Sequence, residues 1–193
     1  TYVGIDEKSF RRGQSYVSIL TDLEESRVLE VSEGRDVKAA NQLWDEIPTP
    51  QAKQVKAVAI DMSAAYKKSV ETQVPQADVV YDRFHISKHL NEAVDKVRRQ
   101  EHKALKEVAD ETLKGSRQLW LFNVENLSEE QWLVFEPLKE IELKTSRAWA
   151  IKEQFRWFWE YGKSGWARRF FDKWYGWAIR SRLPEIKKVA MML

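Results

Sequence analysis

Two aspartates each close a short apolar run in the first third of the chain. Residues 2–5 lead into Asp6, and residues 55–60 lead into Asp61. A carboxylate at the end of a buried strand is costly unless it is paired, hydrogen-bonded or bound to metal. Two carboxylates held close together repel each other, and a hard divalent cation relieves that repulsion. The pair therefore predicts a shared metal site, with a helix N-cap as the alternative role for Asp61.

A third run of this kind, residues 77–81, ends in Asp82. Asp82, His85 and His89 are spaced i, i+3 and i+7, which places them on one face of a helix. These three side chains are potential zinc ligands. We favour structural or site-shaping roles for Asp82 and His85, because a pair of histidines on a helix is more often hydrogen-bonded and because Asp82 can cap the helix.

The composition excludes several classes of protein. The chain has no cysteine, which excludes disulfides and thiolate metal sites. No apolar run reaches the roughly 18 residues that a membrane span needs. A Gly-rich phosphate loop is also absent, which argues against nucleotide hydrolysis. We expect a cytoplasmic, nucleoid-associated protein without membrane contact.

The net charge of +2 hides an asymmetry along the chain. Residues 143–193 hold twelve Lys/Arg against four Asp/Glu, and six of the nine tryptophans. A basic, aromatic segment beside an acidic one is typical of a protein that binds a polyanion in one place and metal in another. The candidate phosphate ligands are Arg156, Lys163, Arg168, Arg169, Lys173 and Arg180.

The alternative reading of this segment is a solvated helical face over a Trp-rich core. The stretch is too apolar to lie wholly on the surface. Its tryptophans therefore include packing residues, for which the candidates are Trp157, Trp159, Trp174 and Trp177.

The predicted elements that position the aspartates follow the order β-β-β-α-β-α-β. The period-two segments and the turn residues predict strands at 2–6, 15–21, 27–31, 55–61 and 77–81, with helices after Asp36 and after Ser63. Such an order gives an α/β fold, a mixed sheet with helices on its faces. In one topology that the right-handed crossover rule allows, the ribonuclease H-like fold, the first and fourth strands are neighbours. Asp6 and Asp61 would then lie side by side.

Beyond Tyr81 the hydrophobic period changes from two to 3.6. We expect helices over 83–114, after a capping box at Ser128, and over 144–161, 167–180 and 184–192, while residues 119–122 are ambiguous. The predicted organisation is residues 1–82 as the first part of the core, 83–143 as a helical insertion and 144–193 as C-terminal helices that complete the core.

Three short strings and one longer segment resemble the catalytic region of bacterial insertion-sequence transposases of the ISL-three family, in the DDE superfamily. The strings are Gly4-Ile5-Asp6-Glu7, Ile60-Asp61-Met62-Ser63 and Tyr81-Asp82-Arg83-Phe84-His85, and the segment is SRAWAIKEQFRWFW. The resemblance covers nearly the whole chain. It implies a ribonuclease H-like core interrupted by a helical insertion after the fifth strand.

The resemblance also implies a catalytic site and its substrates. Asp6 and Asp61 would be the first two acids of the triad, and Asp82-x-x-His85 matches a motif that follows the second aspartate in several such families. Glu153, on a helix after the insertion, is the candidate third acid, and a glutamate in an Asn-Gly-x-x-Glu-Gly-type segment further downstream is its rival. That segment and the N-terminal zinc-finger and helix-turn-helix regions are not in this sequence, so we expect a catalytic-core fragment. The implied cofactors are two Mg²⁺ or Mn²⁺ ions, and the implied partner is DNA, both transposon ends and target, with a homodimer left open.

Three functional hypotheses follow from these observations. The first is an enzyme that cleaves and transfers DNA strands during transposition. The second is a DNA-binding fragment that is catalytically incomplete because it lacks the third acid or other domains. The third is a helical interaction module, which predicts neither Mn²⁺ binding nor salt-sensitive DNA affinity.

Overall fold

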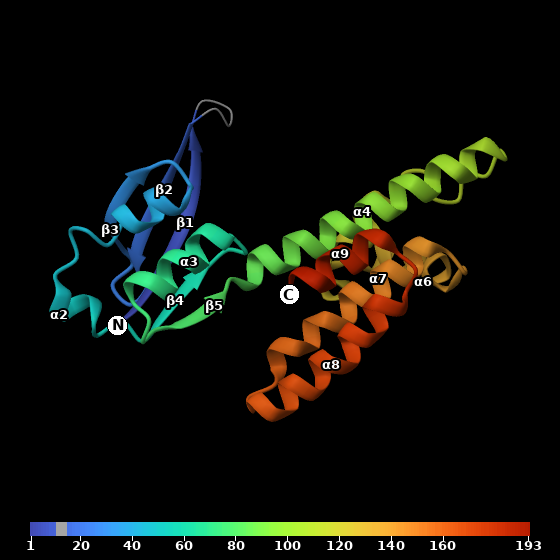
Figure 1. Ribbon diagram of the computed structural model, residues 1–193. Helices are drawn as coiled ribbons and strands as arrows, with labels where there is room; N and C mark the ends of the chain where they lie inside the picture. The colour runs from blue at the N-terminus through green and yellow to red at the C-terminus, as the bar shows by residue number, and fades with distance from the viewer. Residues whose placement is uncertain (11–14) are drawn as a thin grey trace. The chain divides into compact units, whose positions relative to one another are not determined.

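The computed structural model describes residues 1–10 and 15–193. The chain divides into two compact units, Thr1–Ile86 and Ser87–Leu193. The first unit holds the sheet and the second is helical (Figure 1). The long helix α4 (Arg83–Glu107) begins in the first unit and continues in the second. We describe each unit by itself.

The first unit contains a five-stranded mixed sheet with the strand order β3-β2-β1-β4-β5. The antiparallel pairs are β1–β2 and β2–β3, and the parallel pairs are β1–β4 and β4–β5. The predicted mixed α/β sheet is thus confirmed. The strands are β1 (Tyr2–Phe10), β2 (Ser15–Asp22), β3 (Arg27–Glu33), β4 (Ala57–Ile60) and β5 (Asp78–Tyr81).

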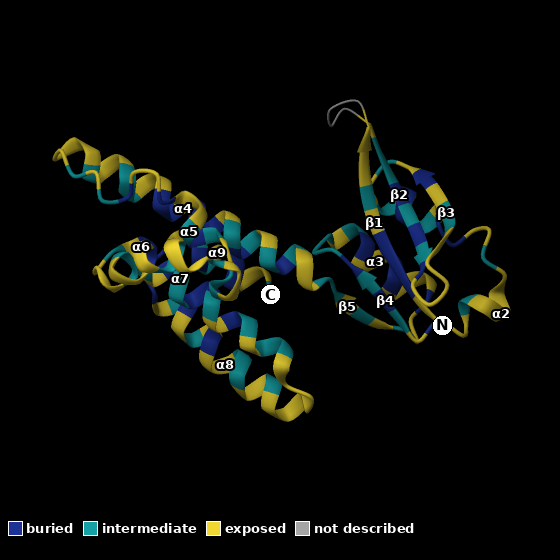
Figure 2. Ribbon diagram, turned by 180° about the vertical axis from the view of Figure 1, so that it is seen from behind, coloured by how far each residue is buried: buried dark blue, intermediate teal, exposed yellow. Residues whose placement is uncertain are grey.

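Two helices, α1 (Val37–Gln42) and α3 (Ala64–Gln73), pack against each other and against the sheet. The predicted helix starts are confirmed, since the side chains of Asp36 and Ser63 each accept a backbone N–H of the first turn. α1 has six residues, and a short helix α2 (Thr49–Ala52) follows it. The core between the sheet and the helices (Figure 2) includes Val3, Ile5, Leu20, Val58 and Ile60 from the strands, Tyr66 and Val70 from α3, and Leu43 and Trp44 directly after α1.

The prediction that the first strand ends at Asp6 is wrong. β1 continues to Phe10, and Phe10 pairs with Ser15 on β2. The residues from Glu7 onward are mostly polar and exposed, so they lack the alternation by which a half-buried strand is recognised. The backbone pairing with β2 keeps them extended. Gly13, between the predicted strands 2–6 and 15–21, lies outside the described residues.

Within the described part of the chain, every regular element after Tyr81 is helical, as predicted. The ambiguous residues 119–122 fall largely in a helix, α5, and the capping box of Ser128 and Gln131 is present. Pro137 lies inside that helix. After α4 the elements are α5 (Arg117–Leu121), η2 (Val124–Asn126), α6 (Glu129–Glu140), α7 (Lys144–Phe155), η3 (Arg156–Glu160), α8 (Ser164–Arg180) and α9 (Pro184–Met192).

Residues 144–193 belong to the same compact unit as residues 87–143. That the C-terminal helices complete the core of the sheet stays a prediction. Among the described residues no helix is long and apolar enough to cross a membrane.

Candidate active site

Asp6 and Asp61 follow two residues that pair across neighbouring parallel strands. Ile5 on β1 is paired with Ile60 on β4, and each isoleucine is followed directly by an aspartate. Neighbouring strands lie about 4.8 Å apart, so the backbones of the two aspartates lie close together at the carboxyl end of β4. This edge is where open α/β sheets bind their ligands.

A third aspartate extends the arrangement by one strand. Ile60 is paired with Tyr81 on β5, and Asp82 comes next along the chain. The Asp82 N–H donates to the carbonyl oxygen of Ile60 at 2.8 Å, which fixes Asp82 beside the end of β4. We call Asp6, Asp61 and Asp82 the aspartate row.

Asp6 and Asp61 each use one carboxylate oxygen to accept a hydrogen bond from a backbone N–H close by in the sequence. Asp6 Oδ1 accepts the N–H of Glu7 at 2.8 Å, and Asp61 Oδ1 accepts the N–H of Ser63 at 2.8 Å. Asp61 thus forms a turn before α3, and Ser63 is the N-cap of that helix. Among the described residues, the other oxygen of each carboxylate has no hydrogen-bond or ion-pair partner. Two hard oxygen donors at one sheet edge fit Mg²⁺ or Mn²⁺.

Tyr66, which the sequence reasoning missed, lies buried near these carboxylates. Burial raises the pKa of the Tyr66 phenol, and the negative charges of Glu7, Asp61 and Asp6 raise it further. Ser18 Oγ donates to the carbonyl oxygen of Gly34 at 2.9 Å, so the phenol donates its proton to Ser18 across 2.9 Å. Helix α3 is thereby tied to β2 near the aspartate row.

Asp82 and His85 make the local contacts predicted for a helix start. Asp82 Oδ1 accepts the N–H of Phe84 at 2.7 Å, and Asp82 Oδ2 lies 3.1 Å from His85 Nδ1. His89 Nδ1 instead faces Glu92, at 3.6 Å. No group of three or more His, Cys, Asp or Glu side chains is arranged as a metal site within residues 1–10 and 15–193. That Asp82 and His85 have structural or site-shaping roles and do not bind zinc stays a prediction.

Glu153 lies on α7 and is held by two cations. Its Oε2 is 2.8 Å from Arg156 Nη1, and its Oε1 is 3.1 Å from Lys152 Nζ. Only 14% of the Glu153 side chain is exposed, so this face of α7 is not simply solvated. From α4, Glu101 accepts the N–H groups of Lys144 and Thr145 at 2.8 and 2.7 Å, and this fixes the start of α7.

Lys152 is a buried cation that joins two helices. Its Nζ donates to the carbonyl oxygens of Trp120 and Phe122, at the C-terminal end of α5, at 3.0 and 3.3 Å. Burial lowers the pKa of the Lys152 ammonium, and the nearby Glu153 carboxylate opposes that shift. The Lys152–Glu153 pair is therefore part of the packing of α7 on α5.

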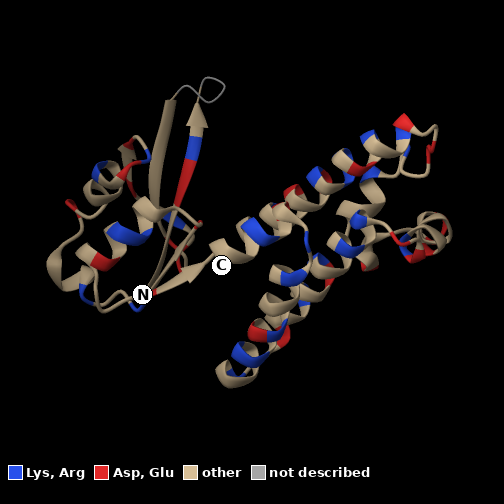
Figure 3. Ribbon diagram, turned by 45° about the vertical axis from the view of Figure 1, so that its right-hand side comes forward, with Lys and Arg blue, Asp and Glu red and all other residues tan. Residues whose placement is uncertain are grey.

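The predicted phosphate ligands fall into two groups. Arg156 lies between the carboxylates of Glu153 and Glu125, and its pKa is raised by these two partners although burial opposes the change. The other five are exposed and lie on or next to α8 (Figure 3). These are Lys163, Arg168, Arg169, Lys173 and Arg180.

The four tryptophans predicted to pack behave differently from one another. Trp174 is buried, and its Nε1 donates to the carbonyl oxygen of Ile151 at 2.8 Å. Trp159 packs edge-on against Phe155. For Trp157 and Trp177, which are 61% and 37% exposed, the packing prediction is wrong. Helical periodicity identifies an apolar face only, and an aromatic side chain outside that face stays in solvent.

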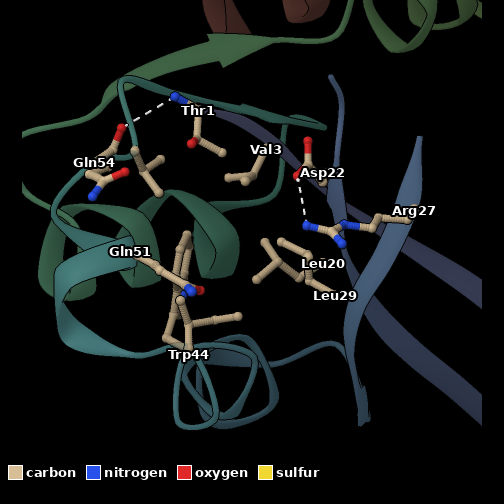
Figure 4. A pocket seen from close by; sticks show the side chains of 11 residues that line it. Thr1, Val3, Leu20, Asp22, Arg27, Leu29, Trp44, Gln51 and Gln54 are labelled. Carbon is tan, nitrogen blue, oxygen red and sulfur yellow. Dashed lines mark hydrogen bonds and ion pairs between the residues drawn. The ribbon is translucent and has the colours of Figure 1, made fainter. Parts of the chain in front are cut away.

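A pocket in the first unit lies at the other end of the parallel strands. Thr1, Val3 and Val55 line it at the start of β1 and just before β4, with Trp44 on its floor (Figure 4). The ion pair between Asp22 and Arg27, at 3.7 Å, borders it. Asp6 and Asp61 come after the last residue pair between β1 and β4, whereas this pocket lies at the first. The pocket is therefore separate from the candidate active site.

Comparison with known proteins identifies the family of this chain. A family model described as Transposase, of the ISL-three DDE group, matches residues 3–193. The chain belongs to this transposase family. The transposase for insertion sequence element IS1001 of Bordetella parapertussis is 30% identical in an alignment of 195 positions, which covers 100% of this chain and 48% of that protein.

A second transposase, that for insertion sequence element IS1557 of Mycobacterium tuberculosis, is 24% identical over 212 residues. This match covers 97% of the present chain and 47% of the relative. The chain thus spans about half the length of the curated transposases that it matches.

Proposed function

We propose that this chain is the catalytic core of a DDE-type transposase with a ribonuclease H-like fold, and that it cleaves and transfers DNA strands with the help of divalent metal ions. The observation that carries the proposal is the pairing of Ile5 with Ile60, which brings Asp6 and Asp61 to one sheet edge. Membership of the transposase family supports DNA as the substrate.

In this proposal Asp6 and Asp61 provide the metal-binding oxygens. Their local hydrogen bonds to the amides of Glu7 and Ser63 hold the carboxylates in place before any ion binds. Two Mg²⁺ or Mn²⁺ ions held there would activate water or a DNA 3′-hydroxyl as the nucleophile and would neutralise charge on the phosphodiester. Two carboxylates leave most of the coordination to water and phosphate oxygens, as Mg²⁺ prefers.

Glu153 is the third acid in the proposal. Its carboxylate is ion-paired with Lys152 and Arg156, so binding a metal requires that it exchange these partners. Asp82 and His85 shape the site, since they fix the chain directly after β5. The exposed cations on and near α8 bind DNA phosphates, and the partners are transposon ends and target DNA.

The test uses the full-length transposase with a labelled duplex that ends in the transposon terminus. Asp6→Asn, Asp61→Asn and Glu153→Gln are each expected to abolish Mn²⁺-dependent strand cleavage while duplex binding is retained. Asp45→Asn, which changes an exposed aspartate after α1, is the matched control and should cleave normally. Normal cleavage by Asp6→Asn or Asp61→Asn would refute the proposal.

A second candidate function is a DNA-binding fragment without a complete catalytic site. The ion pairs that occupy both oxygens of Glu153 favour it. Glu153→Gln separates the two functions. Normal cleavage by this variant removes Glu153 from the triad and leaves the third acid to a residue elsewhere in the full-length protein.

A further inference from the structure

One face of α8 alternates tryptophan with basic side chains. Trp166, Arg169, Lys173, Trp177 and Arg180 are spaced i, i+3, i+7, i+11 and i+14, so at 100° per residue they lie within an arc of about 80°. All five are exposed. Trp174 and Ala178, on another face of the helix, are buried. We call these five residues the α8 stripe.

The cations of the α8 stripe form no ion pairs with the described residues. Among the described residues, no carboxylate lies within ion-pair distance of Arg169, Lys173 or Arg180. Asp172 is the one acid in α8, and it lies about 100° away from the centre of the stripe. The stripe therefore presents positive charge that no carboxylate of the described residues neutralises.

The two tryptophans of the stripe are partly exposed to solvent. Trp166 is 57% exposed and Trp177 is 37% exposed. The guanidinium of Arg169 lies 5.3 Å from the centre of the Trp166 ring, which holds a cation beside the indole. Lys163, Gly165, Trp166 and Arg169 together line a shallow pocket at the start of the helix.

Charge and shape together point to one kind of ligand. A protein surface that docked here would have to supply a carboxylate for each of the three cations, because a buried charge without a partner is costly. A DNA duplex would offer its phosphates to the cations but would keep the faces of its bases inside the stack. Single-stranded DNA offers both groups, because its bases stack on aromatic rings while its phosphates lie along a basic surface.

We propose that the α8 stripe binds single-stranded DNA, with Trp166 and Trp177 stacking on unpaired bases and with Arg169, Lys173 and Arg180 contacting the phosphates. Trp177 follows Trp166 by eleven positions, which is about 16 Å along the helix. About five nucleotides cover that length at the roughly 3.4 Å rise of one B-form strand. The inference rests on the proposed function for its choice of DNA, and strand cleavage at a transposon end is the reaction that would produce such unpaired bases.

The experiment measures the affinity of the full-length transposase for three labelled oligonucleotides by fluorescence anisotropy. The first is a mixed-sequence single strand of twelve nucleotides, the second is an abasic strand of the same length, and the third is the matching duplex. The double variant Trp166→Ala with Trp177→Ala is expected to bind the first oligonucleotide about 30-fold more weakly or worse, and the abasic strand and the duplex as before. Trp166→Phe with Trp177→Phe keeps two aromatic rings and should recover most of the affinity.

Two further variants separate stacking from charge and from folding. Arg169→Ala with Lys173→Ala should weaken binding of the normal and the abasic strand alike, and should reduce the salt slope of each by about 1.4. Trp157→Ala removes an exposed indole outside the stripe and should leave all three affinities unchanged.

Unchanged binding of the normal strand by the double alanine variant would overturn the proposal, as would an equal loss for the abasic strand. The proposal would also be overturned if the double phenylalanine variant lost as much affinity as the double alanine variant and both melted at a lower temperature. That result would assign the two tryptophans a structural role. None of these outcomes changes the expected loss of cleavage in Asp6→Asn, so a failure of this inference is distinct from a failure of the proposed function.

Discussion

Asp6 and Asp61 occupy equivalent positions on two parallel strands, each one residue beyond the paired Ile5 and Ile60. The two isoleucines point into the core, where each is at most 2% exposed. A slip by one residue would turn each strand's apolar side chains away from the core. The burial of both isoleucines therefore fixes the register of the two strands. The stability of the core thus also sets the alignment of the two acids.

Metal binding by this pair is the first prediction. Mn²⁺ at 100 times its dissociation constant should raise the free energy of unfolding of the first unit by about 2.7 kcal/mol. Asp61→Asn should remove this increase without lowering the stability of the metal-free protein, because one of two repelling charges is lost. Thermal unfolding with and without Mn²⁺ measures both effects. An undiminished Mn²⁺ effect in Asp61→Asn would contradict the prediction.

Asp82 should act mainly as a helix cap. Asp82→Ala is expected to lower the free energy of unfolding by about 1 kcal/mol, because the N–H of Phe84 loses its acceptor. Asp82→Asn keeps an acceptor oxygen at the same place and should cost much less. Urea unfolding of the two variants makes the comparison. An equal loss in both would show that the charge of Asp82 matters more than the cap.

Asp95 should make stability depend on pH in the acid range. The Asp95 carboxylate is buried, which by itself would raise its pKa, but hydrogen bonds from Arg98 and Arg117 outweigh burial and lower the pKa below 3.8. Its stabilising effect is fully present above about pH 4 and is lost as the pH falls through the lowered value. Asp95→Asn should therefore be less stable than the parent at neutral pH, with the difference shrinking in acid.

Urea unfolding between pH 7 and the acid limit measures this difference in stability. Asp172→Asn, an exposed aspartate of the same unit, serves as the control and should follow the parent at every pH. A difference between Asp95→Asn and the parent that stays constant down to the acid limit would contradict the assignment.

Lys152 should be essential for the packing of α7 on α5. Lys152→Met leaves the carbonyl oxygen of Trp120 and the carboxylate of Glu153 without their buried cation. Removing one partner of a buried pair typically costs about 3–5 kcal/mol. Lys103→Met, at an exposed lysine of α4, should cost far less. Chemical unfolding measures the free energy of unfolding of the two variants. Equal values for both would contradict a structural role for Lys152.

Arg168 and Arg169 should contribute to DNA affinity through charge. Arg168→Ala with Arg169→Ala is expected to weaken duplex binding and to reduce the salt slope by about 1.8, since two phosphate contacts are lost. The melting temperature should change little, because both side chains are exposed. Binding titrations at several salt concentrations test this. Unchanged affinity would mean that these charges only form a solvent-exposed helical face and do not bind DNA.

The sequence alone determined the features that depend on neighbours along the chain. The caps at Ser63 and Ser128 are recognisable because side-chain type and spacing decide them within one turn of helix. The mixed sheet followed from the order of strand-like and helix-like segments, since few topologies satisfy the connection rules. That Asp6 and Asp61 belong together was therefore predictable before the structure.

Only the tertiary structure decided the features that depend on distant segments. β1 runs past Asp6 because β2 pairs with it, although the residues themselves show no strand pattern. The burial of Lys152 arises where α7 meets α5, because its ammonium donates to the carbonyl oxygen of Trp120, 32 residues away. The exposure of Trp157 and the burial of Tyr66 likewise depend on which surfaces pack together. A periodic pattern shows which face of an element is apolar, but the partner that covers this face is fixed by the packing of the whole unit.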